Sequence, residues 1–192
     1  MKKLLLNAVL MTIATTVLLG IGYPVLVTGL ARVFFPAQAS GELVSRNGVV
    51  VGSRLIGQPF TGPAYFHSRP SAAGSAGYDA TASGASNLGP TNAQLITRVN
   101  GDVARVQAEN PGVPVPVDLV TTSGSGLDPD ITPAAATFQI RRVALERKVA
   151  EGEISKLVLA HITNRQWGFL GEPRVNVLEL NLALDERYGL AR

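Results

Sequence analysis

The longest run of apolar and small residues in the chain extends from Leu4 to Ala31. It contains no charged residue, follows Lys2 and Lys3, and ends at Arg32. As an α-helix it would be about 42 Å long, which exceeds the roughly 30 Å hydrocarbon core of a bilayer. Because only a helix satisfies its own backbone hydrogen bonds in lipid, the run predicts a single transmembrane helix.

A cleaved secretory signal is the alternative, because residues 37–39 (Ala-Gln-Ala) offer an A-x-A cleavage site. The apolar core of a signal peptide is only about 7 to 15 residues long, so a retained anchor is favoured. Lys2, Lys3 and the α-amino group outweigh the single nearby charge of Arg32 on the other side. The positive-inside tendency therefore predicts a cytoplasmic N-terminus and a C-terminal domain in the periplasm.

Small and hydroxylated side chains recur at every fourth position of this predicted helix, namely at Ala8, Thr12, Thr16 and Gly20. Small residues on one face let a second helix approach closely, and such packing drives helix association in lipid. We predict that this strip packs against a helix of a partner protein. The alternative is that Ala, Thr and Gly are simply common in membrane helices.

Residues 36–192 are sufficient for one domain with its own hydrophobic core. Their hydrophobic pattern changes between strand-like and helical periods. We therefore expect an α+β fold, with one N-terminal transmembrane anchor helix in residues 1–35 and a single mixed α/β extramembrane domain in residues 36–192.

The pattern within residues 36–192 predicts a β-hairpin and several helices. Asn47-Gly48 favours a type I′ turn and lies in the weakly alternating stretch Glu42–Leu55. A helix should begin after Asn92 as N-cap, and a second after Thr132, with Gly152 separating the second from a shorter third helix. The buried positions expected in the first two helices are Leu95, Val99, Val103, Val106, Ala136, Ile140, Val143 and Ala144.

The remaining stretches are less regular. Gly57–Pro70 has too many prolines for a helix or a central strand and predicts an ordered, aromatic-rich loop. Residues 71–90 have the Ala, Gly and Ser content of a flexible linker. Val113–Thr122 predicts an edge strand or an extended segment. The last leucines alternate as in a strand, yet Asn176 and Glu179 form a capping-box-like start that favours a helix.

Composition and motifs limit the chemistry of the chain. The net charge of +3 is mild and no basic stripe is present, so nucleic-acid binding is not expected. The absence of cysteine excludes disulfides, thiolate zinc sites and a thiol nucleophile. Ser86 and Ser125 lack the flanking glycines of a nucleophile elbow, His67 and His161 have no metal-type spacing, and no P-loop is present. We predict no catalytic, cofactor-binding or metal-binding residues.

Four long motifs carry a resemblance to a known family. They are LIGQPFTGPAYFHSRPS (55–71), SGASNLGPTN (83–92), VPVDLVTTSGSGLDPDITPAAA (113–136) and GFLGEPRVNVLELNLALD (168–185). In sequence, order and single N-terminal span, they resemble the C subunit of the Kdp potassium-transporting P-type ATPase over nearly the whole chain. Ala85 and Asp130 depart from the family pattern, where a glycine and a histidine are expected.

This resemblance implies a non-catalytic accessory subunit of an ATP-driven potassium import pump in the bacterial inner membrane. Such a subunit assists assembly and ATP use, while ATP and potassium are bound through the rest of the complex. The implied partners are the catalytic P-type ATPase subunit and a potassium-channel-like subunit. A membrane-anchored periplasmic ligand-binding domain or hydrolase is the alternative from the residues alone.

The aromatic and Gly-rich loops are the candidates for extramembrane partner contact, because loops on a scaffold suit recognition and Tyr, Phe and Arg are good interface anchors. The predicted contact residues are Tyr65, Phe66, Arg69, Ser86, Asn87 and Leu88. The alternative for Tyr65 and Phe66 is that they pack within their own domain.

Overall fold

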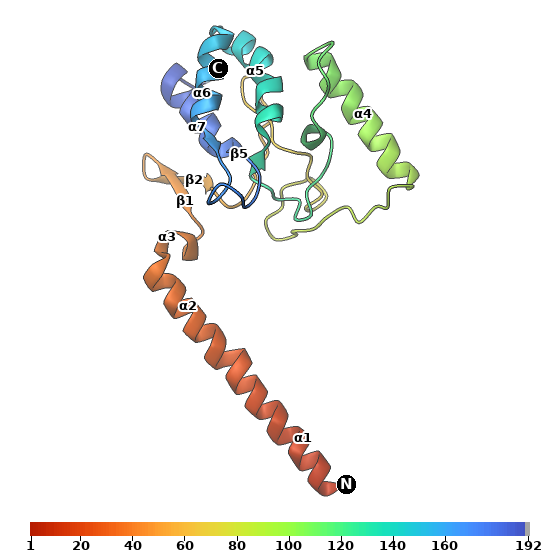
Figure 1. The fold of residues 1–192 in the computed structure, drawn as a ribbon, viewed down its shortest axis with the longest axis vertical. Coiled ribbons are helices and arrows are strands. Elements are labelled where there is room, and N and C mark those ends of the chain that lie inside the picture. Colours follow the sequence, from red (N-terminus) through yellow and green to blue (C-terminus); the bar gives the residue numbers. More distant parts are fainter. Residues whose placement is uncertain (191–192) are drawn as a thin grey trace. The chain divides into compact units, whose positions relative to one another are not determined.

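The computed structural model describes residues 1–190 (Figure 1). By its contacts the chain divides into two units, Met1–Val51 and Gly52–Arg192. The first contains the long apolar helix, and the second contains a small sheet surrounded by helices. This arrangement confirms the expected mixed α/β fold with one N-terminal apolar helix.

The first unit begins with a continuous helical rod made of α1 (Lys2–Thr15), a π-helical segment (Thr16–Gly22) and α2 (Tyr23–Phe34). Its most apolar stretch of 18 residues has a mean hydropathy of 2.2, and none of its segments contains a buried residue. Length and composition therefore allow this helix to cross a membrane.

The π-helical segment has a local cause in Pro24. In an α-helix the proline ring would clash with the carbonyl of Gly20, and its missing N–H would leave that carbonyl without a donor. Instead, the N–H of Tyr23 bonds to the carbonyl of Leu18, five residues earlier. The widened turn accommodates the proline without breaking the rod.

After α3 (Pro36–Ala39), the predicted hairpin is confirmed as β1 (Leu43–Arg46) and β2 (Val49–Ser53). Asn47 and Gly48 have φ angles of 52° and 76°. Two successive positive φ values define the type I′ geometry that their dipeptide favours.

The sheet of the second unit has the strand order β3-β5-β4 and is antiparallel throughout. Its strands are short: β3 (Asp130–Ile131), β4 (Ile162–Thr163) and β5 (Arg174–Asn176). Val175 of the central strand is paired with Ile131 on one side and Ile162 on the other, and it is fully buried.

Helices α5 (Pro133–Arg147), α6 (Glu151–Ala160) and α7 (Val177–Tyr188) supply most of the core. Their fully or almost fully buried side chains include Phe138, Val143, Ile154, Val158, Leu180 and Leu184. Helix α4 (Ala93–Glu109) differs, because Val106 is its one buried residue. The expected apolar stripe of this helix is therefore mostly half-buried or exposed, whereas the stripe predicted for α5 is buried.

All three predicted N-caps are confirmed. The side chains of Asn92, Thr132 and Asn176 accept hydrogen bonds from backbone amides in the first turns of α4, α5 and α7. The ambiguous last segment is a helix that begins after this cap at Asn176. Leu180 and Leu184, four residues apart, lie in the core, whereas Leu182 is half-buried.

Two predictions about secondary structure need correction, although the extended alternative for Val113–Thr122 fits Pro116, whose φ and ψ are −62° and 138°. Val113–Thr122 contains no strand and instead forms a 3₁₀-helical turn at Val117–Leu119, where the buried Asp118 carboxylate accepts bonds from the amide and hydroxyl of Thr132. Gly152 does not separate two helices but lies inside α6; the break is at Lys148, which has a left-handed φ of 56°.

Residues 71–90 have few regular bonds but are not detached from the domain. The amide of Gly84 donates to the carbonyl of Ser125 (2.8 Å), and the hydroxyl of Ser71 donates to the carbonyl of Gly126 (2.6 Å). A Cβ on Gly126 would lie 2.7 Å from the amide nitrogen of Ala73. The small residues thus permit a close approach of two backbones.

Candidate functional site

The last two residues of the predicted strip on the membrane helix share one surface. A Cβ built on Gly20 would lie 3.8 Å from the Cγ2 of Thr16, so these two residues are neighbours on one face. Both residues belong to the π-helical segment and are four positions apart. Ala8, Thr12, Thr16 and Gly20 are all exposed within the chain, and their contact with a partner helix stays a prediction.

The aromatic loop contains a segment whose backbone is held by side chains of α5 and α7. We call residues 63–67 the helix-bound segment. Arg142 donates to the carbonyls of Pro63 and Tyr65, and Arg147 donates to that of Ala64 (2.7 Å). All five carbonyls in the segment are bonded in this way, since Asn181 and Gln139 bond the last two.

Two buried amide side chains each form a pair of bonds with one residue of the segment. Asn181 accepts from the amide of Phe66 and donates to its carbonyl, both at 2.9 Å. Gln139 accepts from the amide of His67 (2.8 Å) and donates to its carbonyl (3.1 Å). These bonds replace the strand partner that the segment lacks, and they place the Phe66 ring in the core with 0% exposure.

A buried ion pair contacts Tyr65 of the same segment. Arg147 and Asp185 are 2.9 Å apart, with only 3% and 8% of their side chains exposed. The Tyr65 hydroxyl donates to Asp185 (3.2 Å), and the Arg147 guanidinium lies 4.8 Å from the centre of the Tyr65 ring. The charges are therefore paired, bonded and capped by an aromatic face.

Arg69 and the Gly-rich loop are brought together along a second segment, Thr121–Asp128. Arg69 donates to the carbonyls of Thr121 and Thr122 and pairs with Asp128 at 3.0 Å. Residues 83–84 donate to Ser125 in the same segment. Of the predicted contact residues that follow, Asn87 is exposed with a left-handed φ of 53°, while Ser86 and Leu88 are half-buried.

The six predicted contact residues thus lie in different environments. Phe66 is interior, Tyr65 and Arg69 are half-buried with bonds to their own domain, and Ser86, Asn87 and Leu88 lie on a loop of the surface. Their role in partner contact stays a prediction, and Phe66 could serve it only by positioning its neighbours.

A cavity of about 310 Å³ lies between the aromatic loop and α4. Its lining is mainly apolar, with His67, Tyr78, Asp102, Arg105 and Glu109 among its polar residues. Burial lowers the pKa of His67, and the neighbouring Arg142 charge adds to the lowering, so the imidazole is neutral at pH 7. Burial raises the pKa of Tyr78, which keeps its hydroxyl protonated.

The charged groups at this cavity are engaged with one another. Arg142 pairs with Glu109 at 2.9 Å, and Asp102 bonds both Arg98 and Arg105. Throughout residues 1–190, no three His, Asp or Glu side chains gather closely enough to hold a metal ion. The cavity can admit a small molecule with an apolar body. Of its lining residues, Ser68 donates its hydroxyl to the carbonyl of Gln58, and the His67 ring is bonded to the carbonyl of Gly62.

The sequence pattern does not identify four residues that organise the helix-bound segment, namely Gln139, Asn181, Arg142 and Arg147. A weak signal was present, because Gln139 and Asn181 are amides inserted beside Ile140 and Leu180 in apolar helical stripes. Their partners are 72 and 115 residues away in the chain, so no local pattern identifies them.

The fold and these sites define a class, namely membrane proteins with one apolar anchor helix and one mixed α/β domain. Comparison with known sequences identifies the family. The chain belongs to the KdpC family, described as the K⁺-transporting ATPase c chain, whose sequence model matches residues 5–186. Membership makes it a membrane subunit of a transport complex and implies a role in potassium transport.

Relatives named potassium-transporting ATPase KdpC subunit match the chain over almost its full length. The protein of Koribacter versatilis is 63% identical over 185 residues, covering 96% of this chain and 95% of the relative. That of Methylobacterium nodulans is 57% identical over 188 residues, covering 92% and 94%, respectively. That of Caulobacter vibrioides is 59% identical over 174 residues, covering 90% and 88%.

Proposed function

We propose that this chain is a non-catalytic accessory subunit of an ATP-driven potassium import pump. It crosses the bacterial inner membrane once, with its N-terminus in the cytoplasm and its α/β domain in the periplasm. It assists assembly of the pump and ATP use by the catalytic P-type ATPase subunit. A potassium-channel-like subunit is the other partner, and ATP and potassium are bound by these partners.

The observation that carries this proposal is the unpartnered apolar helix. This 33-residue helix contains no buried residue, and it is long and apolar enough to cross a membrane, where lipid or other helices would cover it. Thr16 and Gly20 form a shallow surface on it that suits a second helix. The domain supports the accessory role, because its buried polar side chains form bonds within the domain itself and hold its backbone in place. These side chains belong to Arg147, Asp185, Gln139 and Asn181.

The proposed orientation limits how the subunit can affect ATP use. A periplasmic domain is separated from cytoplasmic nucleotide by about 30 Å of hydrocarbon. The effect is therefore transmitted through assembly, with the domain held against the channel-like subunit near its outer mouth. Tyr65, Arg69 and the loop residues Ser86, Asn87 and Leu88 belong to this contact in the proposal, with Phe66 fixing the backbone of Tyr65.

The helix contact is tested with two matched pairs of substitutions. Thr16→Leu with Gly20→Leu fills the predicted face, whereas Ala14→Leu with Gly22→Leu adds comparable bulk about 200° around the helix from Thr16 and Gly20, respectively. The first pair should reduce co-purification with the P-type ATPase subunit and potassium uptake, and the second should leave both near wild type. Equal behaviour of the two pairs would remove the strip from the proposal.

A second candidate function is supported by the cavity beside His67, which is large enough for a small ligand. An anchored periplasmic ligand-binding domain would show saturable binding by the full chain without its partners. A hydrolase would be indicated by labelling of Ser86 or Ser125 with a fluorophosphonate. Neither result is expected if the chain acts only through its partner subunits.

A further inference from the structure

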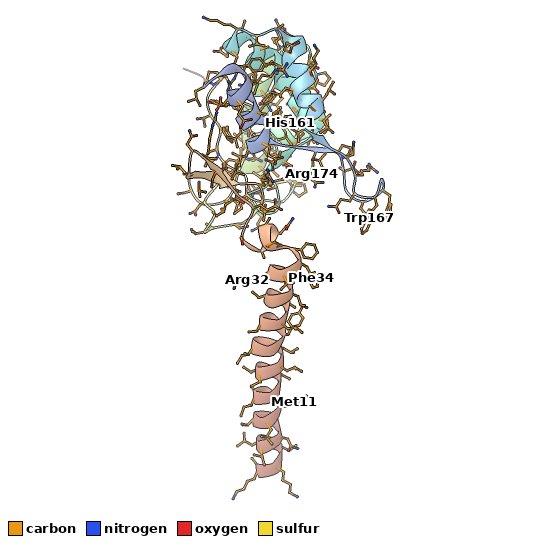
Figure 2. All side chains as sticks on the ribbon, turned by 90° about the vertical axis from the view of Figure 1, so that its left-hand side faces the viewer. Met11, Arg32, Phe34, His161, Trp167 and Arg174 are labelled. Atoms are coloured by element: carbon orange, nitrogen blue, oxygen red, sulfur yellow. The ribbon has the colours of Figure 1, made fainter. Side chains whose placement is uncertain are left out.

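A hairpin between β4 and β5 carries two highly exposed aromatic side chains, Trp167 and Phe169. Its two sides are joined by the bridge between Gln166 and Leu170. Trp167, Phe169 and Leu170 are 85%, 67% and 42% exposed, and we call these three residues the aromatic tip. Figure 2 shows the hairpin with Trp167 extending away from the helices of its domain.

The turn holds its aromatic residues in a fixed and costly conformation. Trp167 has a φ of 52° and Gly168 a φ of 82°. A positive φ is rare for a bulky residue, and such conformations often mark ligand or partner contacts. The Trp167 and Phe169 rings are 6.4 Å apart and tilted by 38°, so they form one ordered apolar surface.

The aromatic tip has no structural task inside its own domain. None of its three residues belongs to the hydrophobic core or packs against it. The apolar side chains of β4 and β5, Ile162 and Val175, contact that core instead. An exposed Trp costs solubility, so an ordered tip of this kind is better explained by a partner surface that covers it.

We propose that the aromatic tip inserts into an apolar pocket on the extramembrane face of the channel-like subunit, the partner against which the proposed function holds this domain. Trp is the residue most enriched among energetically dominant interface contacts. At the base of the hairpin, Arg165 and Glu172 form an exposed ion pair at 2.5 Å. An apolar centre with a polar rim is the usual anatomy of a protein interface.

A lipid headgroup layer fits the tip less well than a protein pocket. The Arg165–Glu172 pair cancels its own charge, so the hairpin offers little attraction to an anionic membrane surface. Insertion into lipid also does not require a strained turn with a fixed ring pair. The inference depends on the proposed accessory role only because it requires a partner subunit to be present.

Photo-cross-linking in the assembled complex tests this directly. A benzoylphenylalanine is placed at position 167 of the full chain and, as a control, at position 159, where Leu159 is 65% exposed on α6. The complex is irradiated in intact membranes, then purified and digested. We expect a cross-link from position 167 to one defined site on the channel-like subunit and at least tenfold less from position 159.

A phospholipid adduct at position 167 would overturn the proposal in favour of membrane insertion. The absence of any adduct in an intact complex, or equal cross-linking at both positions, would also overturn it. These outcomes leave the accessory role standing, because that role fails only if the wild-type chain does not co-purify with the pump.

Substitution provides a second, independent measurement. Trp167→Ala with Phe169→Ala should reduce co-purification at least tenfold after stringent washing, and Trp167→Phe should restore most of it. Leu145→Ala, at a position 75% exposed on α5, should have no effect. Unfolding of the variant should occur at the wild-type temperature, since the tip is outside the core. Unchanged co-purification of the double variant would contradict the proposal.

Discussion

Phe66 and Trp167 are both aromatic residues in irregular loops, yet the first is 0% exposed and the second 85% exposed. The helix-bound segment around Phe66 has its carbonyls bonded by side chains from two distant helices. The hairpin around Trp167 is closed by short-range backbone bonds such as that from Leu170 to Gln166 (3.0 Å). Aromatic content alone therefore does not distinguish an interior loop from a recognition loop; the origin of the bonds to its backbone does.

The largest effect should follow from removing the buried charge that supports the helix-bound segment. Arg147→Met leaves Asp185 buried without its cation and the Ala64 carbonyl without its donor. We expect a loss of about 3–5 kcal/mol in the free energy of unfolding. Urea unfolding of the full chain in detergent, followed by circular dichroism, measures it.

The matched double variant sharpens this prediction. Arg147→Met with Asp185→Leu removes both charges, so the penalty for a buried carboxylate that has lost its cation disappears. It should be more stable than Arg147→Met alone. A double variant that is less stable than the single one would show that Asp185 holds the segment independently of Arg147.

The second largest effect should come from Asn181. Asn181→Leu retains the volume but leaves the buried amide and carbonyl of Phe66 without partners, which should cost about 2–4 kcal/mol. The same substitution at the exposed Asn164, near the hairpin, should change stability by less than about 0.5 kcal/mol. Equal effects at the two positions would remove the difference between the two loops.

A smaller effect should appear as a pH dependence of the helix-bound segment. Burial and the Arg142 charge lower the pKa of His67 below its ordinary value of 6.5, with Glu109 opposing and Arg105 adding to the lowering. The unfolded chain therefore takes up a proton at higher pH than the folded chain does. The contribution of His67 is complete above about pH 6.5 and is lost as the pH falls through its folded-state pKa.

His67→Gln should remove that part of the pH dependence of unfolding. Asp130 acts in the opposite direction, because burial raises its pKa, so its contribution declines as the pH rises above 3.8. The difference between the wild type and His67→Gln isolates the effect of His67, because Asp130 is present in both. Parallel pH profiles for the variant and the wild type would contradict the assignment.

The smallest effect on stability should be found at the aromatic tip. Trp167→Ala removes a large side chain but no core contact, so the free energy of unfolding should change by less than about 0.5 kcal/mol. Thermal unfolding of the isolated full chain measures this. A loss above about 1 kcal/mol would mean that Trp167 packs against its own domain in solution.

Local signals predicted much of the fold. Asn47-Gly48 identified the hairpin, and Asn92, Thr132 and Asn176 identified helix starts, because a turn or a cap acts within a few residues. The absence of charge in Leu4–Ala31 identified the long helix for the same reason.

The partner-contact regions were harder to predict because their environments depend on distant residues. Phe66 looked like a candidate contact because its loop is rich in proline and aromatics, but Asn181, 115 residues later, places it in the core. Trp167 has no such local signal, because it lies directly before Gly168 in a stretch without helical or strand periodicity. Its exposure follows from a turn conformation that composition does not specify.

Hydrogen exchange compared between the full chain alone and the assembled complex tests the central claim most directly. The account predicts that the amides of Phe66 and His67 are protected equally in both, since Asn181 and Gln139 already bond them. The amides at 168–170 should become strongly protected only in the complex. Tip amides that exchange equally in both states, or a helix-bound segment that is protected only after assembly, would contradict it.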